Sequence, residues 1–378
     1  MDAADFADVL SGLRTFIRQE VVPREAEIDA TDEMPATLVA QAKKMGLYGY
    51  ALPEEWGGLG LTVEQQVRVA FELGYTCPAF RSLFGTNNGI AGQVIVMAGT
   101  PTQRADILPR LASGECVASF ALTEPEAGSD PGRLTTSATP DGDGWVIDGA
   151  KRFITNAPVA DLFMVFARTE PVAPPGKGIG VFAVPARTPG VHVAPPDHKM
   201  GQQGAWTADV TFDRVRVGAD TLVGGSPATG YATAMESLAH GRLTIAGVCV
   251  GLSGRLVEEM VGYARERHQG GRAIGEYQLI QAMIADSYTD YLAARALVLE
   301  SARAYDDGTD RKVAPSAAKY FASEAVGRIA DRAVQVHGGS GYMRGVPVER
   351  FYRDARLFRI YEGTSQIQQI IIARGLLR

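Results

Sequence analysis

Apolar residues near the start of the chain recur with the period of a helix. They are spaced mostly three or four residues apart, at Phe6, Val9, Leu10, Leu13, Phe16 and Ile17. This spacing places them on one face of a helix. Similar patterning continues to about residue 113, with turn-forming residues at 53–60 (PEEWGGLG) and a helix start at Thr100-Pro101. The pattern predicts an all-helical N-terminal domain over residues 1–115.

The period of the pattern changes after Cys116. Short runs of β-branched and aromatic residues follow, separated by Gly, Pro, Asp and Asn: VASFAL, WVIDG, LFMVFA, GVFAV and ADVTFDRVRV. Runs of this length and composition are typical of strands. We therefore expect a middle β-domain over residues 116–223.

Long helical patterns return beyond residue 224. They cover about 235–268, 278–305 and 315–336, and a further helix follows near the C-terminus. Helices of this length with apolar faces predict a C-terminal bundle over residues 224–378. The expected fold class is mainly α with a central β-domain.

Composition narrows the class of protein. A chain of 378 residues is longer than the roughly 250–300 residues at which one hydrophobic core stops growing. The net charge of -6, without a cluster of Lys and Arg, argues against a nucleic-acid or anionic-membrane surface. The three cysteines, Cys77, Cys116 and Cys249, are widely separated and fit buried reduced thiols better than disulfides or a zinc site.

The N-terminal segment MDAADFADVLSGLRTFI carries acids where a targeting peptide would carry Arg or Lys. No apolar run approaches the roughly 18 residues that cross a bilayer. A cytoplasmic protein is expected. The motifs G-x-G-x-x-G after a strand, the Walker loop, H-E-x-x-H and G-x-S-x-G are absent, and no two histidines are spaced as metal ligands on a helix. No metal site is expected.

Two segments of the middle part could bind a planar polar ligand. FALTEPEAGSD at 120–130 ends a strand in a turn of small residues, where Thr123 and Ser129 offer hydroxyls. KRFITNA at 151–157 places Phe153 and Thr155 on the same strand face. A plain surface loop and a half-buried strand end are the alternative interpretations.

Two segments of the bundle could approach a phosphate. QVHGGSGY at 335–342 ends a helix in paired glycines, and ARERHQGGRAIGEYQ at 264–278 brings Arg267, Gln269 and Gln278 to a helix end. Ordinary helix termination and a solvated basic helix end would explain these sequences equally well.

The segment RIYEGTSQIQQIII at 359–372 places one carboxylate, Glu362, just before an apolar helix. Ser365 and Gln368 have the spacing of a capping box, which predicts a helix whose Ile367, Ile370 and Ile371 face inward. Glu362 could complement the helix dipole or act as a functional acid or base. The local sequence leaves both interpretations open.

Taken together, these motifs resemble the acyl-CoA dehydrogenase family. The resemblance rests on the order of PEEWGGLG, LTEPEAGSD, a strand with ITN, KMG followed by DVTFDRVRV, GRLTIAG, QVHGGSGY and FYRDARLFRIYEGTSQIQ. It implies an N-terminal helical domain, a β-barrel-like middle domain and a C-terminal four-helix bundle. It also implies a homotetramer with one FAD per subunit.

The resemblance assigns roles to individual residues. The implied FAD-binding residues, some of them acting across a subunit interface, are Leu122, Thr123, Gly128, Ser129, Phe153, Thr155, Arg267, Gln269, Gln278, Gln335, Gly338, Gly339, Thr364 and Gln366. The implied substrate-binding residues are Ser129, Arg242, Tyr361 and Gly363. Phe153 occupies the place commonly held by Trp.

Glu362 matches the family's usual catalytic base. Some relatives supply the base instead from the residue before the bundle arginine, which is Gly241 here. The implied reaction removes an α-proton from an acyl-CoA thioester and passes a β-hydride to flavin N5, giving a trans-2-enoyl-CoA as in β-oxidation of fatty acids. An electron-transfer flavoprotein would normally accept the electrons. A desolvated carboxylate suits this chemistry because its basicity rises in an apolar cavity.

Two departures and three alternatives accompany the resemblance. Gly270 and Gly271 stand where relatives commonly have Phe-Gly, which predicts weaker FAD retention, and Ala239 stands where relatives often have Asp. An acyl-carrier-protein thioester as substrate, or oxygen as electron acceptor, would fit the same fold. A nucleic-acid-associated flavin-binding relative should have a basic face and a C-terminal extension, whereas this chain is acidic and stops at Arg378.

Overall fold

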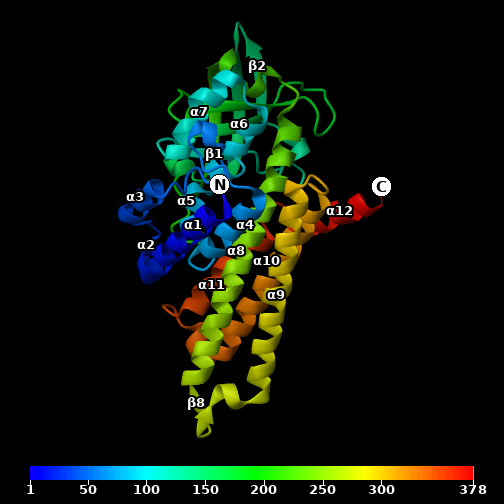
Figure 1. The fold of residues 1–378 in the computed structure, drawn as a ribbon. Helices are drawn as coiled ribbons and strands as arrows, with labels where there is room; N and C mark the ends of the chain where they lie inside the picture. The colour runs from blue at the N-terminus through cyan, green and yellow to red at the C-terminus, as the bar shows by residue number, and fades with distance from the viewer. Residues whose placement is uncertain (378) are drawn as a thin grey trace.

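The computed structural model describes residues 1–377 and has helices at both ends of the chain around a central sheet, as predicted (Figure 1). Phe6, Leu13, Phe16 and Ile17 are buried, so the predicted apolar face of the first helix is confirmed. The helix start expected at Thr100-Pro101 is confirmed, since the Thr100 hydroxyl accepts from the backbone N–H of Gln103 and Pro101 is the first helical residue; the Gln103 side chain completes a capping box that was not predicted. The helices are α1 (Ala3–Phe16), α2 (Glu25–Thr31), α3 (Ala36–Lys44), α4 (Val63–Leu73), α5 (Pro78–Asn88), α6 (Gly92–Ala98) and α7 (Pro101–Ser113).

The central part is one curled sheet built around β4. β5 pairs with one edge of β4, while β1 and β2 share the other edge, and β3, β7 and β6 follow β2 in that order. Phe163, Phe182 and Phe212 fill the interior. The strands are β1 (Ala118–Ala121), β2 (Ser137–Asp141), β3 (Gly144–Thr155), β4 (Leu162–Arg168), β5 (Ile179–Pro185), β6 (Val191–Val193) and β7 (Thr207–Gly218).

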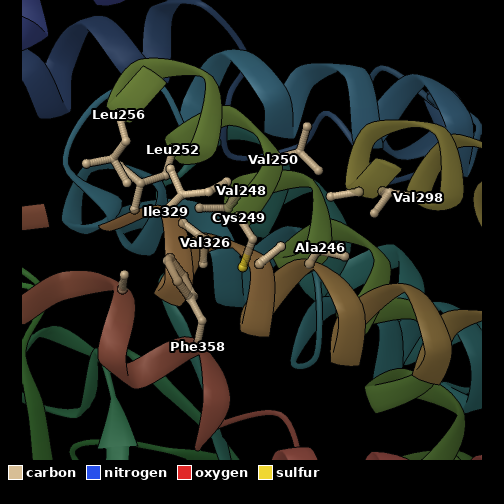
Figure 2. Packing of buried hydrophobic residues seen from close by; sticks show 14 of the residues in the cluster. Ala246, Val248, Cys249, Val250, Leu252, Leu256, Val298, Val326, Ile329 and Phe358 are labelled. Carbon is tan, nitrogen blue, oxygen red and sulfur yellow. The ribbon is translucent and has the colours of Figure 1, made fainter. Parts of the chain in front are cut away.

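Three long helices make up most of the C-terminal part: α8 (Gly230–Glu266), α9 (Gln278–Asp306) and α10 (Val313–His337). α8 runs from the sheet to the far end of the bundle, where the short hairpin β8 (His268–Gln269) and β9 (Arg272–Ala273) joins it to α9 (Figure 1). α11 (Pro347–Arg356) and α12 (Ser365–Leu376) follow and pack against α10. Figure 2 shows Leu252 of α8, Ile329 of α10 and Phe358 meeting in the core.

The three cysteines are buried free thiols, as expected from their spacing. Among residues 1–377, no helix combines the length and the apolar character needed to cross a membrane.

α11 anchors the middle part of the chain through Asp354, which is buried. The backbone N–H of Gln202 donates to the Asp354 carboxylate, and Gln202 Nε2 donates to its carbonyl oxygen at 3.1 Å. The neighbouring arginines bind other carboxylates, Arg350 to Glu25 and Arg353 to Asp29. Burial therefore dominates and raises the pKa of Asp354 to about 7.

This pKa predicts a loss of stability as pH rises. A carboxyl group with a raised folded-state pKa stabilises the fold at low pH, and the contribution is lost as pH rises through about 7. Between pH 5 and pH 8 the native protein should lose roughly 2–3 kcal/mol more unfolding free energy than an Asp354→Asn variant. Urea unfolding of both proteins at the two pH values measures this. Parallel losses in the two proteins would contradict it.

Candidate active site

Glu362 lies in a tight turn between the short helical turn Leu357–Arg359 and α12. Its φ is 56°, and that of Gly363 is 88°, so two consecutive residues are in the left-handed region. This conformation costs a residue with a side chain about 1–2 kcal/mol. The surrounding structure must hold Glu362 in place, and backbone strain of this kind concentrates at functional sites.

Two buried side chains hold the turn by its carbonyl groups. Gln368 Nε2 donates to the carbonyl oxygens of Glu362 and Gly363, each at 3.0 Å. Lys319 of α10 donates from Nζ to the Gly363 carbonyl oxygen at 2.8 Å. Gln368 and Lys319 are both inaccessible to solvent. The turn is therefore fixed both by the helix that follows it and by a helix of the bundle.

The start of α12 differs from the prediction. Thr364 is the N-cap and accepts from the backbone N–H of Ile367, while Ser365 is the first helical residue. The predicted capping box between Ser365 and Gln368 is wrong because the Gln368 amide binds the turn instead. The prediction that Ile370 faces inward is also wrong: it is 43% exposed, whereas Ile367 and Ile371 are half-buried. The reason is that α12 extends away from the bundle (Figure 1).

The Glu362 carboxylate lies against Gly241 of α8. A Cβ atom added at Gly241 would be 2.7 Å from Glu362 Oε2 and 3.2 Å from Oε1. Oε2 is shielded from solvent and has no hydrogen-bond partner within residues 1–377. Burial raises the pKa of Glu362, although the charges of Arg81, Arg242 and Lys319 oppose the shift. A shielded, unpaired carboxylate of this kind can take a proton from a weak acid.

The cationic side chains near Glu362 come from three helices. Arg242 is buried on α8, and its Nη1 donates to Ser316 Oγ at 3.4 Å. Burial lowers the pKa of Lys319 on α10 to about 8. Arg81 reaches toward the same region from α5. The site therefore gathers one carboxylate and three cations from parts of the chain that are far apart in sequence.

The two segments of the middle part that were predicted to bind a ligand are joined. The backbone N–H of Arg152 donates to the Thr123 carbonyl oxygen at 2.8 Å, and Ser119 Oγ donates to the Thr155 carbonyl oxygen at 2.8 Å. A buried ion pair fixes the same loop, with Lys151 Nζ 2.7 Å from the nearer oxygen of Glu124. Lys151 holds the pKa of that carboxyl down at about 2, against the effect of burial.

Phe153 stands out from this surface. It is 57% exposed and has a φ of 57° at a bulge in the pairing of β3 with β7. Ile154 beside it is buried, so Phe153 and Thr155 lie on the opposite face, as strand alternation predicts. An exposed aromatic ring on a strained bulge offers a flat apolar surface to a ligand.

The remaining predicted residues lie in three places. Leu122 is buried just after β1, and Gly128 and Ser129 are exposed in the following loop. Tyr361 and Thr364 are half-buried beside Glu362, and Gln366 is exposed on α12. A third set, called the far group here, is exposed at the far end of the bundle: Arg267, Gln269, Gln278, Gln335, Gly338 and Gly339.

The far group is not brought to Glu362 within one chain. The Tyr263 ring of α8 stacks on His337 at the end of α10, with 4.2 Å between ring centroids, which places the paired glycines near the last turn of α8. Figure 1 shows the β8 hairpin at the opposite end of the bundle from α12. In a single chain, the far group and Glu362 form two separate surfaces.

Family models cover almost the whole chain. The N-terminal, middle and C-terminal domains of acyl-CoA dehydrogenases match residues 5–115, 119–215 and 228–377. The chain belongs to the acyl-CoA dehydrogenase family. A 3-(aryl)acrylate reductase of Clostridium sporogenes and an acyl-CoA dehydrogenase of Bacillus subtilis are each 37% identical, covering 97% of this chain and 96% of theirs.

A solved structure shows the same fold. The butyryl-CoA dehydrogenase of Megasphaera elsdenii is 30% identical, with a TM-score of 0.95 over 99% of this chain and 98% of that one. The fold expected from the sequence resemblance is confirmed. The chain is thus an oxidoreductase of the acyl-CoA dehydrogenase family.

In this acyl-CoA dehydrogenase homologue, sequence reasoning found Glu362, Gly241 and Arg242 but missed Arg81 and Lys319. Neither missed residue stands in a recognisable motif, and each reaches the site through packing of a helix distant in sequence. A signal was present in Lys319, since a lysine within the apolar stretch of a bundle helix needs a buried acceptor.

Proposed function

We propose that this protein is an FAD-dependent acyl-CoA dehydrogenase that uses Glu362 as the base for the α-proton of an acyl-CoA thioester. The observation that carries the proposal is the Glu362 carboxylate, which is shielded and unpaired at Oε2 and held in a strained turn. A carboxylate with no such task would lower its energy by reaching water or a cation.

The chain's own groups suit removal of this proton. Gln368 and Lys319 fix the turn by its carbonyl groups, so the backbone that carries the carboxylate keeps one position. The backbone N–H of Glu362 has no acceptor within residues 1–377. It is therefore free to donate to a thioester oxygen, on which negative charge develops as the α-proton leaves.

The surface of the middle part fits a flavin. The exposed Phe153 ring offers a stacking surface, and a Cβ at Gly128, Gly338 or Gly339 would meet no atom within 4 Å, so a ligand can approach the backbone there. The flavin ring of FAD would be held by Thr123, Ser129, Phe153 and Thr155. Its adenosine would be held by the far group of a second subunit in a homotetramer. Bound FAD would supply the acceptor for the β-hydride. An electron-transfer flavoprotein is the proposed acceptor of the electrons.

Reduction of an enoyl thioester is a second candidate. It is favoured by the 37% identity to a 3-(aryl)acrylate reductase. The same residues would serve, because the reverse reaction returns a proton from Glu362 to the α-carbon. Anaerobic mixing of the holoenzyme with acyl-CoAs should bleach the flavin absorbance, and reduced holoenzyme mixed with enoyl-CoAs should regain it. If only the second reaction occurs, the protein is a reductase; if neither occurs, the proposed function is wrong.

We expect weak FAD retention. Gly270 lacks the aromatic side chain common in relatives, so a contact to the cofactor is lost. The flavin-to-protein ratio should fall during gel filtration of dilute protein and recover with added FAD. Retention of one FAD per chain would contradict this. A Gly270→Phe variant is a poor test, because Gly270 has a φ of 62° and a Cβ there would lie 2.6 Å from the Tyr277 hydroxyl.

A further inference from the structure

Lys151 is completely enclosed by the middle part of the chain. Its side chain has no exposure to solvent. Three oxygens accept from its ammonium group: Glu124 Oε1 at 2.7 Å, the Phe166 carbonyl oxygen at 2.7 Å and the Leu122 carbonyl oxygen at 3.2 Å. These acceptors match the three donors of an ammonium group. Lys151 on β3 therefore joins β4 to the loop that follows β1.

The Glu124 carboxylate is almost as well enclosed, with a side chain that is 2% exposed. Oε1 accepts from Lys151 and from the backbone N–H of Thr136 at 2.9 Å. Oε2 accepts from the backbone N–H of Thr135 at 2.6 Å and from its hydroxyl at 2.8 Å. The ion pair thus also ties the loop after β1 to the segment that leads into β2.

Both halves of the surface proposed for the flavin ring begin at this ion pair. Thr123 directly precedes Glu124, and its carbonyl oxygen accepts from the backbone N–H of Arg152. The bulge that exposes Phe153 starts directly after Lys151 in the pairing of β3 with β7. A shift of either charged residue would therefore move Thr123 and Phe153 relative to each other.

Stability is a poor explanation for an ion pair in this place. Taking two charges out of water costs about as much as their attraction returns, and apolar side chains of similar volume are often equally stabilising. Apolar side chains, however, lack direction. Lys151 and Glu124 hold backbone groups of the loop, of β4 and of the segment before β2 at fixed distances.

We propose that Lys151 and Glu124 are positioning residues for the flavin, because their ion pair sets the spacing between Thr123 and the exposed ring of Phe153. The inference rests on the proposed function, since it takes FAD to lie on this surface. Both charged side chains are enclosed, so they act on the ligand only through the backbone that they hold. Groups that contact a ligand must be held within about 0.5 Å of their productive position by such supporting contacts.

The test measures FAD affinity in variants that remove the ion pair. The holoprotein is passed through an ultrafilter at falling concentrations, and free FAD in the filtrate is measured by fluorescence. The variants are Lys151→Met, Glu124→Gln and the double variant. All three should bind FAD roughly ten- to a hundredfold more weakly than native protein, the range that supporting groups contribute at metal sites.

Urea unfolding of the same variants separates positioning from stability. Each single substitution leaves one buried charge without its partner, which is strongly destabilising, whereas the double variant removes both charges. The double variant should therefore resist urea better than either single variant and still bind FAD weakly. Native FAD affinity in the double variant would overturn the positioning role and leave the ion pair a structural one.

Two further variants complete the test. Arg216→Met is the matched control, because it removes an exposed ion pair with Asp141 from the same sheet and should leave FAD affinity unchanged. Thr135→Val removes one hydroxyl donor to Glu124 at an exposed position, so it should fold even if the enclosed variants do not. It should weaken FAD binding about threefold, and unchanged affinity would contradict the inference. If native protein binds no FAD, the proposed function fails as well; if it binds FAD and every variant binds equally, this inference alone fails.

Discussion

Replacing Glu362 with Gln should lower the rate of flavin bleaching by acyl-CoA by about 10²–10⁴-fold. The amide keeps the size of the side chain and the backbone N–H but cannot accept the α-proton. The carbonyl groups held by Gln368 and Lys319 are unchanged, so the turn should persist. The measurement is anaerobic stopped-flow absorbance at saturating substrate, with FAD content checked first.

A matched control is Glu236→Gln, which changes an exposed carboxylate on α8 in the same way. It should bleach at the native rate. If the flavin of Glu362→Gln bleached as fast as that of native protein, Glu362 would not be the base, and the shielded carboxylate would need another explanation.

Gly241→Ala should lower the same rate by about 10–100-fold, because it displaces the carboxylate without removing it. The added methyl group would lie 2.7 Å from Glu362 Oε2, which is closer than real Cβ contacts, so the side chain must move. The lysine and glutamine that hold the turn oppose a compensating backbone shift.

The control for this variant is Gly262→Ala on the same helix, where an added Cβ meets nothing within 4 Å. It should leave the rate unchanged and add up to about 1 kcal/mol of stability, since Ala is the better helix former. Equal rates in the two variants would show that Gly241 does not position the base.

The order of helical and strand segments was predictable because each has a strong periodic pattern. β2 and β6 were missed because SATPD includes proline and aspartate, which are rare in strands, and VHV is only three residues long. They form because each pairs with a longer strand, β2 with β3 and β6 with β7. α11 was missed because its sequence was interpreted only as part of a motif, although its apolar Val348, Phe351 and Ala355 repeat at helical spacing.

The candidate site was predictable only where a motif marked it. Glu362 and Arg242 stand in recognisable sequences, whereas Arg81 and Lys319 become neighbours of Glu362 through the packing of α5, α8 and α10. The inward face assigned to α12 failed for a related reason. Periodicity shows that a helix has an apolar face, but not whether its own chain covers that face.

The contact between Gly241 and Glu362 also restricts how such a site can change during evolution. A carboxylate introduced on α8 would occupy the space already filled by the one in the turn. A larger side chain at position 241 would therefore displace the Glu362 carboxylate from its present place. Glycine at this position of α8 and a carboxylate in the turn are thus linked choices, and a change at one is expected to require a change at the other.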